Sequence, residues 1–423
     1  MNLKELQTKY PKFRYSDYSY KISGNNLKIS FLFKIEPDIV FNPEIVIENI
    51  PKEYNDKGFE NLVFNLGLIE MISYWKSTAS LEIEVECGKL DEDQVHFFQW
   101  VILNGMGQYF YENKIKPFSP KITSKGKELE MDTNKKSERY LIPIGGGKDS
   151  AVTLEILKQK EKINCFSLNP TSAALKIMEI GECKNPIIVK RIIDNNLLEL
   201  NRKGFLNGHT PFSAYLAFLT VLVAKMFDFK YIALSNEKSS EEGNVEYMGL
   251  TINHQWSKSY LFEKGFRHYC RSYLSKEIEY FSFLRMFYEL QIASMFSKYP
   301  KYFPAFMSCN EAYKTDSGRK KPTGKWCGKC SKCLFAFLML YPFLDKKVMI
   351  DIFGSNLFED ESLIPILEEL IGKREVKPLE CVGTRKESMV ALNISWEKNK
   401  IVERDKQPAL LKYFEEEILT KEK

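Results

Sequence analysis

The residues best suited to do chemistry lie in one short segment, "RYLIPIGGGKDSAVTLEILKQ", residues 139–159. Six of them follow one another directly: Gly145, Gly146, Gly147, Lys148, Asp149 and Ser150. Glycines let the backbone turn sharply and leave its N–H groups open. The helical pattern that follows adds the positive end of a helix dipole. The segment therefore predicts an anion site, with a plain strand-to-helix turn capped by Asp149 as the alternative.

Two common phosphate loops do not fit this segment. A Walker loop needs glycine where the chain has Ile142 and Ser or Thr where it has Asp149. The dinucleotide fingerprint needs a different glycine spacing. The segment resembles the pyrophosphate loop of the ATP pyrophosphatases, Ser-Gly-Gly-x-Asp-Ser, with Gly145 in place of the leading serine. The resemblance implies that ATP is cleaved to AMP and pyrophosphate to adenylate a substrate oxygen, that Asp149 helps to organise Mg²⁺, and that Ser150 donates to phosphate.

A second constellation consists of four cysteines: Cys309, Cys327, Cys330 and Cys333. Two successive C-x-x-C spacings and one remote cysteine supply four thiolates, enough for a closed tetrahedral zinc site. An iron–sulfur cluster is the competing metal assignment, and free buried cysteines are the alternative without metal. The cluster resembles the zinc site of deazaguanine-type nitrile synthases, which implies a structural role for the ion.

The elements around the glycine segment alternate between strand and helix. Strands are expected at 140–144, 163–169, 186–192 and 231–236, and helices at 149–160, 171–180 and 210–227. The last helix is expected to open at Thr210 with Pro211 in its first position. This alternation predicts a parallel sheet covered on both faces, with ligands beyond the carboxyl ends of its strands. Residues 145–150 and 235–237 both fall at such ends.

The rest of the chain has a different character. Before the glycine segment, strands are expected at 27–35, 44–50 and 81–87 and helices at 59–77 and 91–115, followed by a polar linker at 117–139. From residue 357 the tail is expected to be mainly helical. We therefore predict an α/β protein: an N-terminal α+β domain (1–135), a parallel-sheet, adenine-nucleotide-hydrolase-like pyrophosphate-loop domain with the four-cysteine site (136–345), and a helical C-terminal region (346–423).

Composition narrows the class of protein. The 61 basic and 56 acidic residues give a net charge of only +5, too weak to predict a nucleic-acid partner. The first residues lack the apolar core of a signal peptide, and the longest apolar runs are about half the ~20 residues of a membrane span. Nine cysteines, an odd number, favour a reducing compartment over a disulfide scaffold. A soluble cytoplasmic protein without a membrane partner is expected, of undetermined oligomeric state.

Eight motifs together resemble the bacterial ATP-dependent UDP-N-acetylmuramoyl-L-alanyl-L-glutamate epimerases of peptidoglycan synthesis. They are, in chain order, "SYWKS", "GMGQYFYEN", "IPIGGGKDS", "SNEKSSEEGN", "NHQWSKS", "SCN", "WCGKCSKC" and "ECVGT". The resemblance implies that the enzyme inverts the terminal L-glutamate of a UDP-MurNAc-dipeptide. It also implies that ATP is consumed in the reaction and that Mg²⁺ is bound. Residues 234–259, too irregular for a strand, are expected to form a site loop in which Asn236 contacts the nucleotide.

Within that resemblance, five side chains are candidates for proton transfer: Glu237, Lys238, His254, Lys258 and Cys381. Each lies in a polar segment expected to face the site and has a tunable pKa. Four arginines are candidate clamps for the substrate's anionic groups: Arg267, Arg271, Arg285 and Arg385. His96, His209 and His268 are expected to be structural.

Three other functions fit part of the pattern. A ligase or amidotransferase-like enzyme would also adenylate a carboxylate and would then pass it to an amine. A nitrile-synthase-like enzyme would modify a nucleobase, although the near-neutral charge disfavours it. A nucleotide sensor would bind ATP without turnover.

Overall fold

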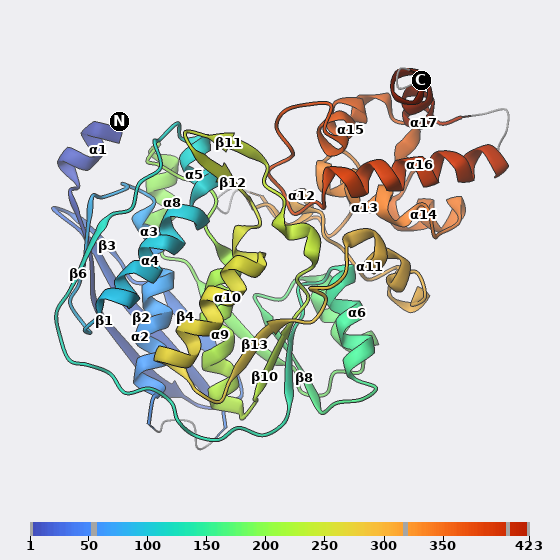
Figure 1. Ribbon diagram of the computed structural model, residues 1–423. Coiled ribbons are helices and arrows are strands. Elements are labelled where there is room, and N and C mark those ends of the chain that lie inside the picture. The colour runs from blue at the N-terminus through green and yellow to red at the C-terminus, as the bar shows by residue number, and fades with distance from the viewer. Residues whose placement is uncertain (1–2, 52–56, 316–319, 403–406, 421–423) are drawn as a thin grey trace.

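The computed structural model describes residues 3–51, 57–315, 320–402 and 407–420, and these residues are organised around an 11-stranded sheet (Figure 1). The strands run in the order β13-β10-β7-β8-β9-β4-β2-β1-β5-β6, with β3 paired to β2. Their bounds are β1 Lys12–Ser23, β2 Asn26–Ile35, β3 Ile39–Phe41, β4 Glu44–Ile47, β5 Glu82–Val85, β6 Lys121–Ser124, β7 Tyr140–Pro143, β8 Ile163–Leu168, β9 Ile187–Ile192, β10 Tyr231–Leu234 and β13 Glu279–Ser282.

Helices pack around this sheet and extend beyond it at the C-terminal end. Those before the glycine segment are α1 Leu3–Lys9, α2 Phe59–Glu70, α3 Ile72–Trp75, α4 Glu92–Gly105 and α5 Gly107–Glu112. Those that follow in the central part are α6 Lys148–Leu157, α7 Ser172–Ile180, α8 Asn195–Arg202, α9 Phe212–Phe227, α10 Tyr260–Tyr269, α11 Glu289–Phe296 and α12 Asn310–Tyr313. The last are α13 Ser331–Leu340, α14 Lys346–Phe353, α15 Ile364–Ile371, α16 Arg385–Val402 and α17 Ala409–Phe414.

Five neighbouring strands, β13, β10, β7, β8 and β9, are parallel, as the alternating pattern predicts. Their carboxyl ends therefore share one edge of the sheet, where ligands bind in open α/β sheets. The sheet as a whole is mixed, because β9 pairs antiparallel with β4 and so joins the N-terminal strands. The predicted division at residues 135 and 136 stays a prediction, and strands from both sides of it are hydrogen-bonded neighbours here.

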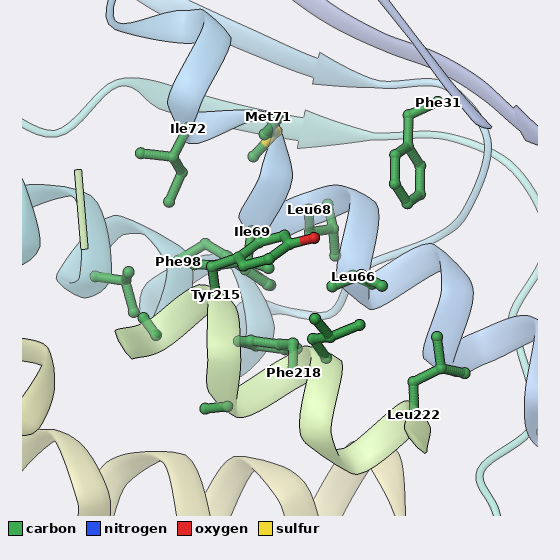
Figure 2. Close-up of a cluster of buried hydrophobic side chains, with 14 of the residues drawn as sticks. Phe31, Leu66, Leu68, Ile69, Met71, Ile72, Phe98, Tyr215, Phe218 and Leu222 are labelled. Carbon is green, nitrogen blue, oxygen red and sulfur yellow. The ribbon is translucent and has the colours of Figure 1, made fainter. Parts of the chain in front are cut away.

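The larger hydrophobic core cluster includes most residues of α2 and α9, two helices that pack against each other. Figure 2 shows Leu66 and Leu68 of α2 beside Tyr215 and Phe218 of α9, with Phe98 of α4 in the same cluster. A helix that is apolar all round must be covered on every side. The N-terminal and central parts of the chain therefore share one core.

Several sequence-based expectations are wrong in detail. The segment expected to be a linker contains β6, which pairs in parallel with β5. Residues 234–259 contain an antiparallel hairpin, β11 Val245–Tyr247 and β12 Leu250–Ile252, although a strand was not expected there. Helix α9 begins at Phe212, and Pro211 is the N-cap residue rather than the first helical residue. The long strand β1 was missed.

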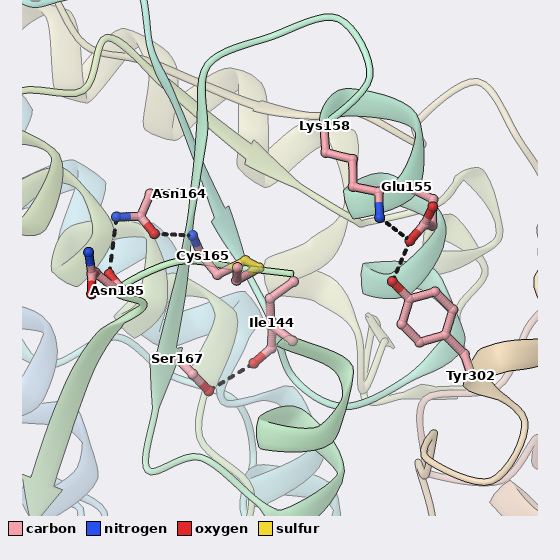
Figure 3. Close-up of a disulfide and its surroundings, with 9 residues drawn as sticks. Ile144, Glu155, Lys158, Asn164, Cys165, Ser167, Asn185 and Tyr302 are labelled. Atoms are coloured by element: carbon pink, nitrogen blue, oxygen red, sulfur yellow. Dashed lines mark hydrogen bonds and ion pairs between the residues drawn. A yellow bond between two sulfur atoms is a disulfide. The ribbon is translucent and has the colours of Figure 1, made fainter. Parts of the chain in front are cut away.

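One disulfide is present, between Cys165 on β8 and Cys183 just after α7 (Figure 3). It ties the end of that helix to the sheet. The sequence analysis expected no disulfide scaffold and did not foresee this single pair. The other seven cysteines form no disulfide.

Helices α13 to α17 gather at one end of the molecule, beside α11 and α6 (Figure 1). The predicted helical C-terminal region is thus confirmed for the described residues. Among those residues, no helix combines the length and apolar character that crossing a membrane would require.

Candidate active site

The glycine turn joins β7 to α6 at the carboxyl edge of the parallel strands. Gly146 has a φ of +97°, and a Cβ atom there would lie 2.9 Å from the backbone nitrogen of Ala174, so only glycine fits. Gly147 is the N-cap residue in an extended conformation, and no side chain caps the helix. The alternative in which Asp149 caps α6 is therefore not what the structure has. The first N–H groups of α6 lack intrahelical acceptors, as at any helix start, and face this edge.

Neighbouring segments hold the turn in place. The Ser167 hydroxyl donates to the Ile144 carbonyl over 2.9 Å, which fixes the strand end just before the glycines (Figure 3). On the other side, the Met307 N–H donates to the Gly146 carbonyl over 2.8 Å. The Ser150 hydroxyl donates to the Gly147 carbonyl over 3.0 Å. The turn is thus supported by β8 and by the segment that leads to Cys309.

Three carboxylates converge beside the turn. One oxygen from each of Asp149, Glu237 and Glu289 lies within 4.8 Å of the others. Asp149 comes from the first turn of α6, Glu237 from the loop after β10, and Glu289 from the first residue of α11. The Lys148 ammonium forms ion pairs with Asp149, over 2.5 Å, and with Glu289. The three carboxyl groups form an acidic cluster at the carboxyl edge of the sheet, and the charges of Lys258 and Lys332 also act on Glu237.

The electrostatics of this cluster reflect its burial. Burial, followed by the charge of Asp149, raises the pKa of Glu289 to about 7. Burial also raises the pKa of Glu237, against the opposing effect of Lys258. Burial opposes the charge of Lys148, yet Asp149 and Glu289 outweigh it and raise the pKa of its ammonium. A further cation nearby would therefore favour the ionised forms of Glu237 and Glu289.

The donor set fits a hard divalent cation. Mg²⁺ prefers oxygen ligands and is commonly held by one or two carboxylates together with substrate phosphates. Asp149, Glu237 and Glu289 supply such oxygens beside a turn whose N–H groups suit phosphate. Glu289 was not among the predicted site residues. No sequence pattern marks it, because only the packing of α11 against α6 brings it to the loop.

A second group of predicted residues lies next to the acidic cluster. The Lys258 ammonium lies 3.2 Å from the Cys381 sulfur and 3.4 Å from the Gln255 Oε1 atom. Burial raises the pKa of the Cys381 thiol, but Lys258 and then Lys332 outweigh it, so the pKa is lowered. The Lys332 ammonium also donates to the Cys381 carbonyl. Lys332, in the cysteine segment, was not predicted as a site residue.

His254 is half-buried and lies within reach of the charge of Lys258. Its Nδ1 atom lies 2.6 Å from Gln108 Oε1, and its ring centroid lies 4.4 Å from that of His209. Burial, followed by the positive charge of Lys258, lowers the pKa of His254 to about 4. The imidazole is therefore neutral at pH 7. His209, expected to be structural, is its direct neighbour.

The structure separates the other predicted residues from this group. Lys238 is exposed, with its ammonium 4.8 Å from the centre of the Tyr288 ring, so it lies outside the buried cluster. Asn236 is buried at the edge, where its amide donates to Ser282 Oγ over 3.1 Å. Its predicted contact with a nucleotide stays a prediction.

The four arginines predicted as anion clamps are engaged elsewhere. Arg267 and Arg271 pair with Glu279, at the amino end of β13 and so opposite the glycine turn. Arg285 donates to the carbonyls of Glu237 and Lys258, over 2.9 and 2.6 Å, and thereby holds the site loop together. Arg385 donates to the Glu375 carbonyl. The clamp prediction is not supported by these placements.

The four predicted cysteines do come together. The sulfur–sulfur distances are 3.9 Å for Cys309–Cys330, 3.6 Å for Cys327–Cys333 and 3.5 Å for Cys330–Cys333. Tetrahedral zinc with Zn–S bonds of about 2.3 Å places its sulfurs about 3.8 Å apart. A multi-iron cluster would hold its thiolates further apart, because irons and sulfides lie between them. The four sulfurs fit a single tetrahedral ion.

Fold and site together define an α/β protein in which a glycine turn lies beside a cluster of three carboxyl groups, at the carboxyl edge of parallel strands. Comparison with known families identifies it further. Residues 4–283 match the MurL N-terminal domain and residues 305–421 match the MurL C-terminal domain. The chain belongs to the MurL family, which confirms the resemblance found in the sequence.

Three relatives carry the same name, UDP-N-acetyl-alpha-D-muramoyl-L-alanyl-L-glutamate epimerase. The protein from Xanthomonas oryzae pv. oryzae is 31% identical over 82% of this chain and 78% of its own length. Those from Micromonospora sp. and Salinispora tropica are 33% and 32% identical, over 78% and 79% of this chain and 73% of their own lengths.

Proposed function

We propose that this chain inverts the terminal L-glutamate of UDP-MurNAc-L-Ala-L-Glu, the reaction for which its relatives are named, and that it activates the substrate by adenylation with ATP. The observation that carries the adenylation proposal is the acidic cluster of Asp149, Glu237 and Glu289 beside the glycine turn. This arrangement can hold a polyphosphate and its counter-ion together. Because the substrate is a nucleotide-linked precursor, we place the reaction in the cytoplasm.

Adenylation solves the chemical difficulty of the reaction. The Cα–H of a free carboxylate is a very weak acid, since its removal would place a second negative charge beside the first. Attack of the glutamate carboxylate on the α-phosphorus of ATP forms an acyl-adenylate and releases pyrophosphate. The charge that develops on removal of the α-proton can then spread onto the acyl oxygen. After reprotonation from the other face, water cleaves the acyl-adenylate into the D-glutamyl product and AMP.

The residues of the turn and the acidic cluster bind and orient ATP in this proposal. Backbone N–H groups from Gly145 to Ser150 face the β- and γ-phosphates. Asp149, Glu237 and Glu289 hold Mg²⁺, which when bound neutralises the charge of the departing pyrophosphate. Lys148 keeps the carboxylates oriented and offsets part of their charge.

Proton transfer belongs to the neighbouring group. The Cys381 thiol faces an ammonium at 3.2 Å, so Lys258 favours the thiolate and can return a proton to it. This pair is one of the two exchange groups that inversion requires. The four-cysteine cluster holds a structural zinc ion, whose loop supports the glycine turn through Met307.

The test combines product analysis with isotope exchange. The protein is incubated with ATP, Mg²⁺ and UDP-MurNAc-L-Ala-L-Glu in deuterated water. We expect one AMP per turnover and deuterium at the α-carbon of a D-configured glutamate. AMP release only after addition of an amine would favour a ligase, and release of ADP would contradict adenylation.

A variant pair tests the site. Asp149→Asn should lower AMP formation by about 10²-fold or more, since it removes a charge from the cation site. Asp351→Asn, at an exposed position on α14, is the matched control and should leave the rate unchanged. Unaltered AMP formation in Asp149→Asn would refute the assignment of the site.

A further inference from the structure

The motif "GMGQYFYEN" brings two side chains of α5 to the site from the N-terminal part of the chain. The Gln108 Nε2 atom donates to Glu112 Oε1 over 2.8 Å, and Gln108 Oε1 lies 2.6 Å from His254 Nδ1. Glu112, Gln108 and His254 thus form a chain of hydrogen bonds that starts at the exposed side of α5 and ends at the imidazole. None of the steps proposed above uses it.

The direction of this chain follows from donor and acceptor chemistry. A carboxylate has no proton to donate, so Glu112 can only accept. The Gln108 amide must therefore turn its NH₂ group to Glu112 and its oxygen to the imidazole. An amide oxygen can only accept, so His254 Nδ1 must carry the proton. In a neutral imidazole this leaves the lone pair on Nε2.

The rest of the surroundings keeps the ring neutral and in position. The His254 backbone N–H donates to Asn244 Oδ1 over 2.8 Å, and the Asn244 amide donates to the Pro378 carbonyl over 2.6 Å. Four charged groups act on the His254 ring: Lys258, Glu380, Lys332 and Glu112 of α5. Lys76 and Lys258 act on the neighbouring His209 ring. A neutral ring beside ammonium groups suits a proton acceptor, because protonation becomes favourable only when a negative charge develops nearby.

We propose that His254 Nε2 exchanges the glutamate α-proton on one face, and that Gln108 and Glu112 are positioning residues that fix its tautomer. The inference rests on the proposed function. In the step, the Cα–H bond breaks, its electron pair stays with the acyl-adenylate as an enolate, and the proton forms a bond to Nε2. The Cys381–Lys258 pair delivers a proton to the opposite face, and the cycle ends with both groups reset from water.

The tautomer can be measured without turnover. The chain has four histidines, so ¹⁵N-histidine labelling gives a spectrum in which His254 is assigned with a His254→Gln variant. We expect a pyrrole-type shift at Nδ1 and a pyridine-type shift at Nε2. Gln108→Met and Glu112→Gln should both change this pattern. Gln99→Met is the matched control, because the Gln99 side chain lies on α4 and donates to the Pro120 carbonyl, away from His254. A protonated Nε2 in the unaltered protein would overturn the proposal.

Kinetics separate this inference from the proposed function. With ATP and substrate in deuterated water, His254→Gln should lose α-deuterium incorporation by about 10²- to 10⁴-fold while acyl-adenylate formation, followed by pyrophosphate exchange, is retained. Gln108→Met should likewise lose α-deuterium incorporation and keep pyrophosphate exchange. In other enzymes, variants that leave a catalytic histidine in the wrong tautomer also lose the proton-transfer step. The proposed role of His254 would be overturned if His254→Gln incorporated deuterium as fast as the unaltered protein. It would also be overturned if this variant lost pyrophosphate exchange as much as it lost deuterium incorporation. Absence of AMP formation in the unaltered protein would instead contradict the proposed function. The tautomer of His254 could still be measured, because that experiment does not need turnover.

Discussion

Lys148 lies between two carboxyl groups and so defines the charge balance of the site. Its side chain is 8% exposed, and it pairs with both Asp149 and Glu289. Removal of one partner from a buried ion pair leaves an uncompensated charge, which is more costly than the loss of the pair itself. Lys148 therefore stabilises two carboxyl groups of the acidic cluster in the free protein.

Glu289 should make the stability of the metal-free protein depend on pH. Its pKa is raised from 4.5 to about 7, by burial first and by Asp149 second. Between these values the folded protein binds more protons than the unfolded chain, so the free energy of unfolding falls as pH rises. Glu289→Gln should flatten this fall, measured as the urea midpoint at pH 5 and pH 7. Equal slopes in Glu289→Gln and in the exposed-site control Glu397→Gln would contradict the assignment.

At the scale of elements, two neighbouring positions of the glycine turn differ in the side chains they can accept: Gly146 accepts none, whereas Gly145 has room for one. A Cβ atom on Gly146 would collide with α7, and its φ of +97° strains any other residue. Gly145 has nothing within 4 Å of such an atom, so it can accept the serine that pyrophosphate loops carry there. The two neighbours therefore offer a matched pair of substitutions.

Gly146→Ala should lower the free energy of unfolding by about 1–3 kcal/mol, the typical cost of such backbone strain, and reduce AMP formation. Gly145→Ser should leave the unfolding midpoint unchanged and keep or strengthen ATP binding through its hydroxyl group. Denaturant unfolding and ATP titration check both. A Gly146→Ala protein with unchanged stability and activity would show that the turn does not need its left-handed residue.

Local pattern made some elements predictable and others not. Strands β7 to β10 and helices α6 and α9 follow from apolar periodicity, which acts over neighbouring residues. Strand β6 escaped notice because its residues are polar enough for a linker, and only pairing with β5 makes them a strand. The same holds for the site: the glycine turn and Cys309–Cys333 could be found from spacing, whereas Glu289 and Gln108 reach it only through packing between distant helices.

At the scale of the whole molecule, three regions meet at one edge of the sheet. The central strands supply the glycine turn, α5 of the N-terminal part supplies Gln108, and the segment before α16 supplies Cys381. The segment that carries the cysteine cluster contacts both the turn and the segment before α16. Its Cys309 follows Met307, which bonds Gly146, and Lys332 lies between Cys330 and Cys333 and contacts Cys381.

Metal analysis should find about one zinc per chain, as a closed structural site implies. Cys330→Ser should lose the metal and lower the unfolding midpoint, and it should also weaken ATP binding because the support of Gly146 is released. Cys87→Ser, at a free cysteine on the N-terminal side, is the control and should keep the zinc. Iron with a visible absorption band would assign a different metal, and a metal-free protein of full stability would refute the site.

The central claim is that the substrate's glutamate carboxylate attacks ATP, and the most direct test follows its oxygen atoms. UDP-MurNAc-L-Ala-L-Glu is prepared with ¹⁸O in the glutamate α-carboxylate and turned over with ATP and Mg²⁺ in ordinary water. If the carboxylate is adenylated, an ¹⁸O atom leaves with the phosphate of AMP when water attacks the acyl carbon, and mass spectrometry should find labelled AMP. AMP without label, formed while the D-glutamyl product keeps both ¹⁸O atoms, would contradict the account.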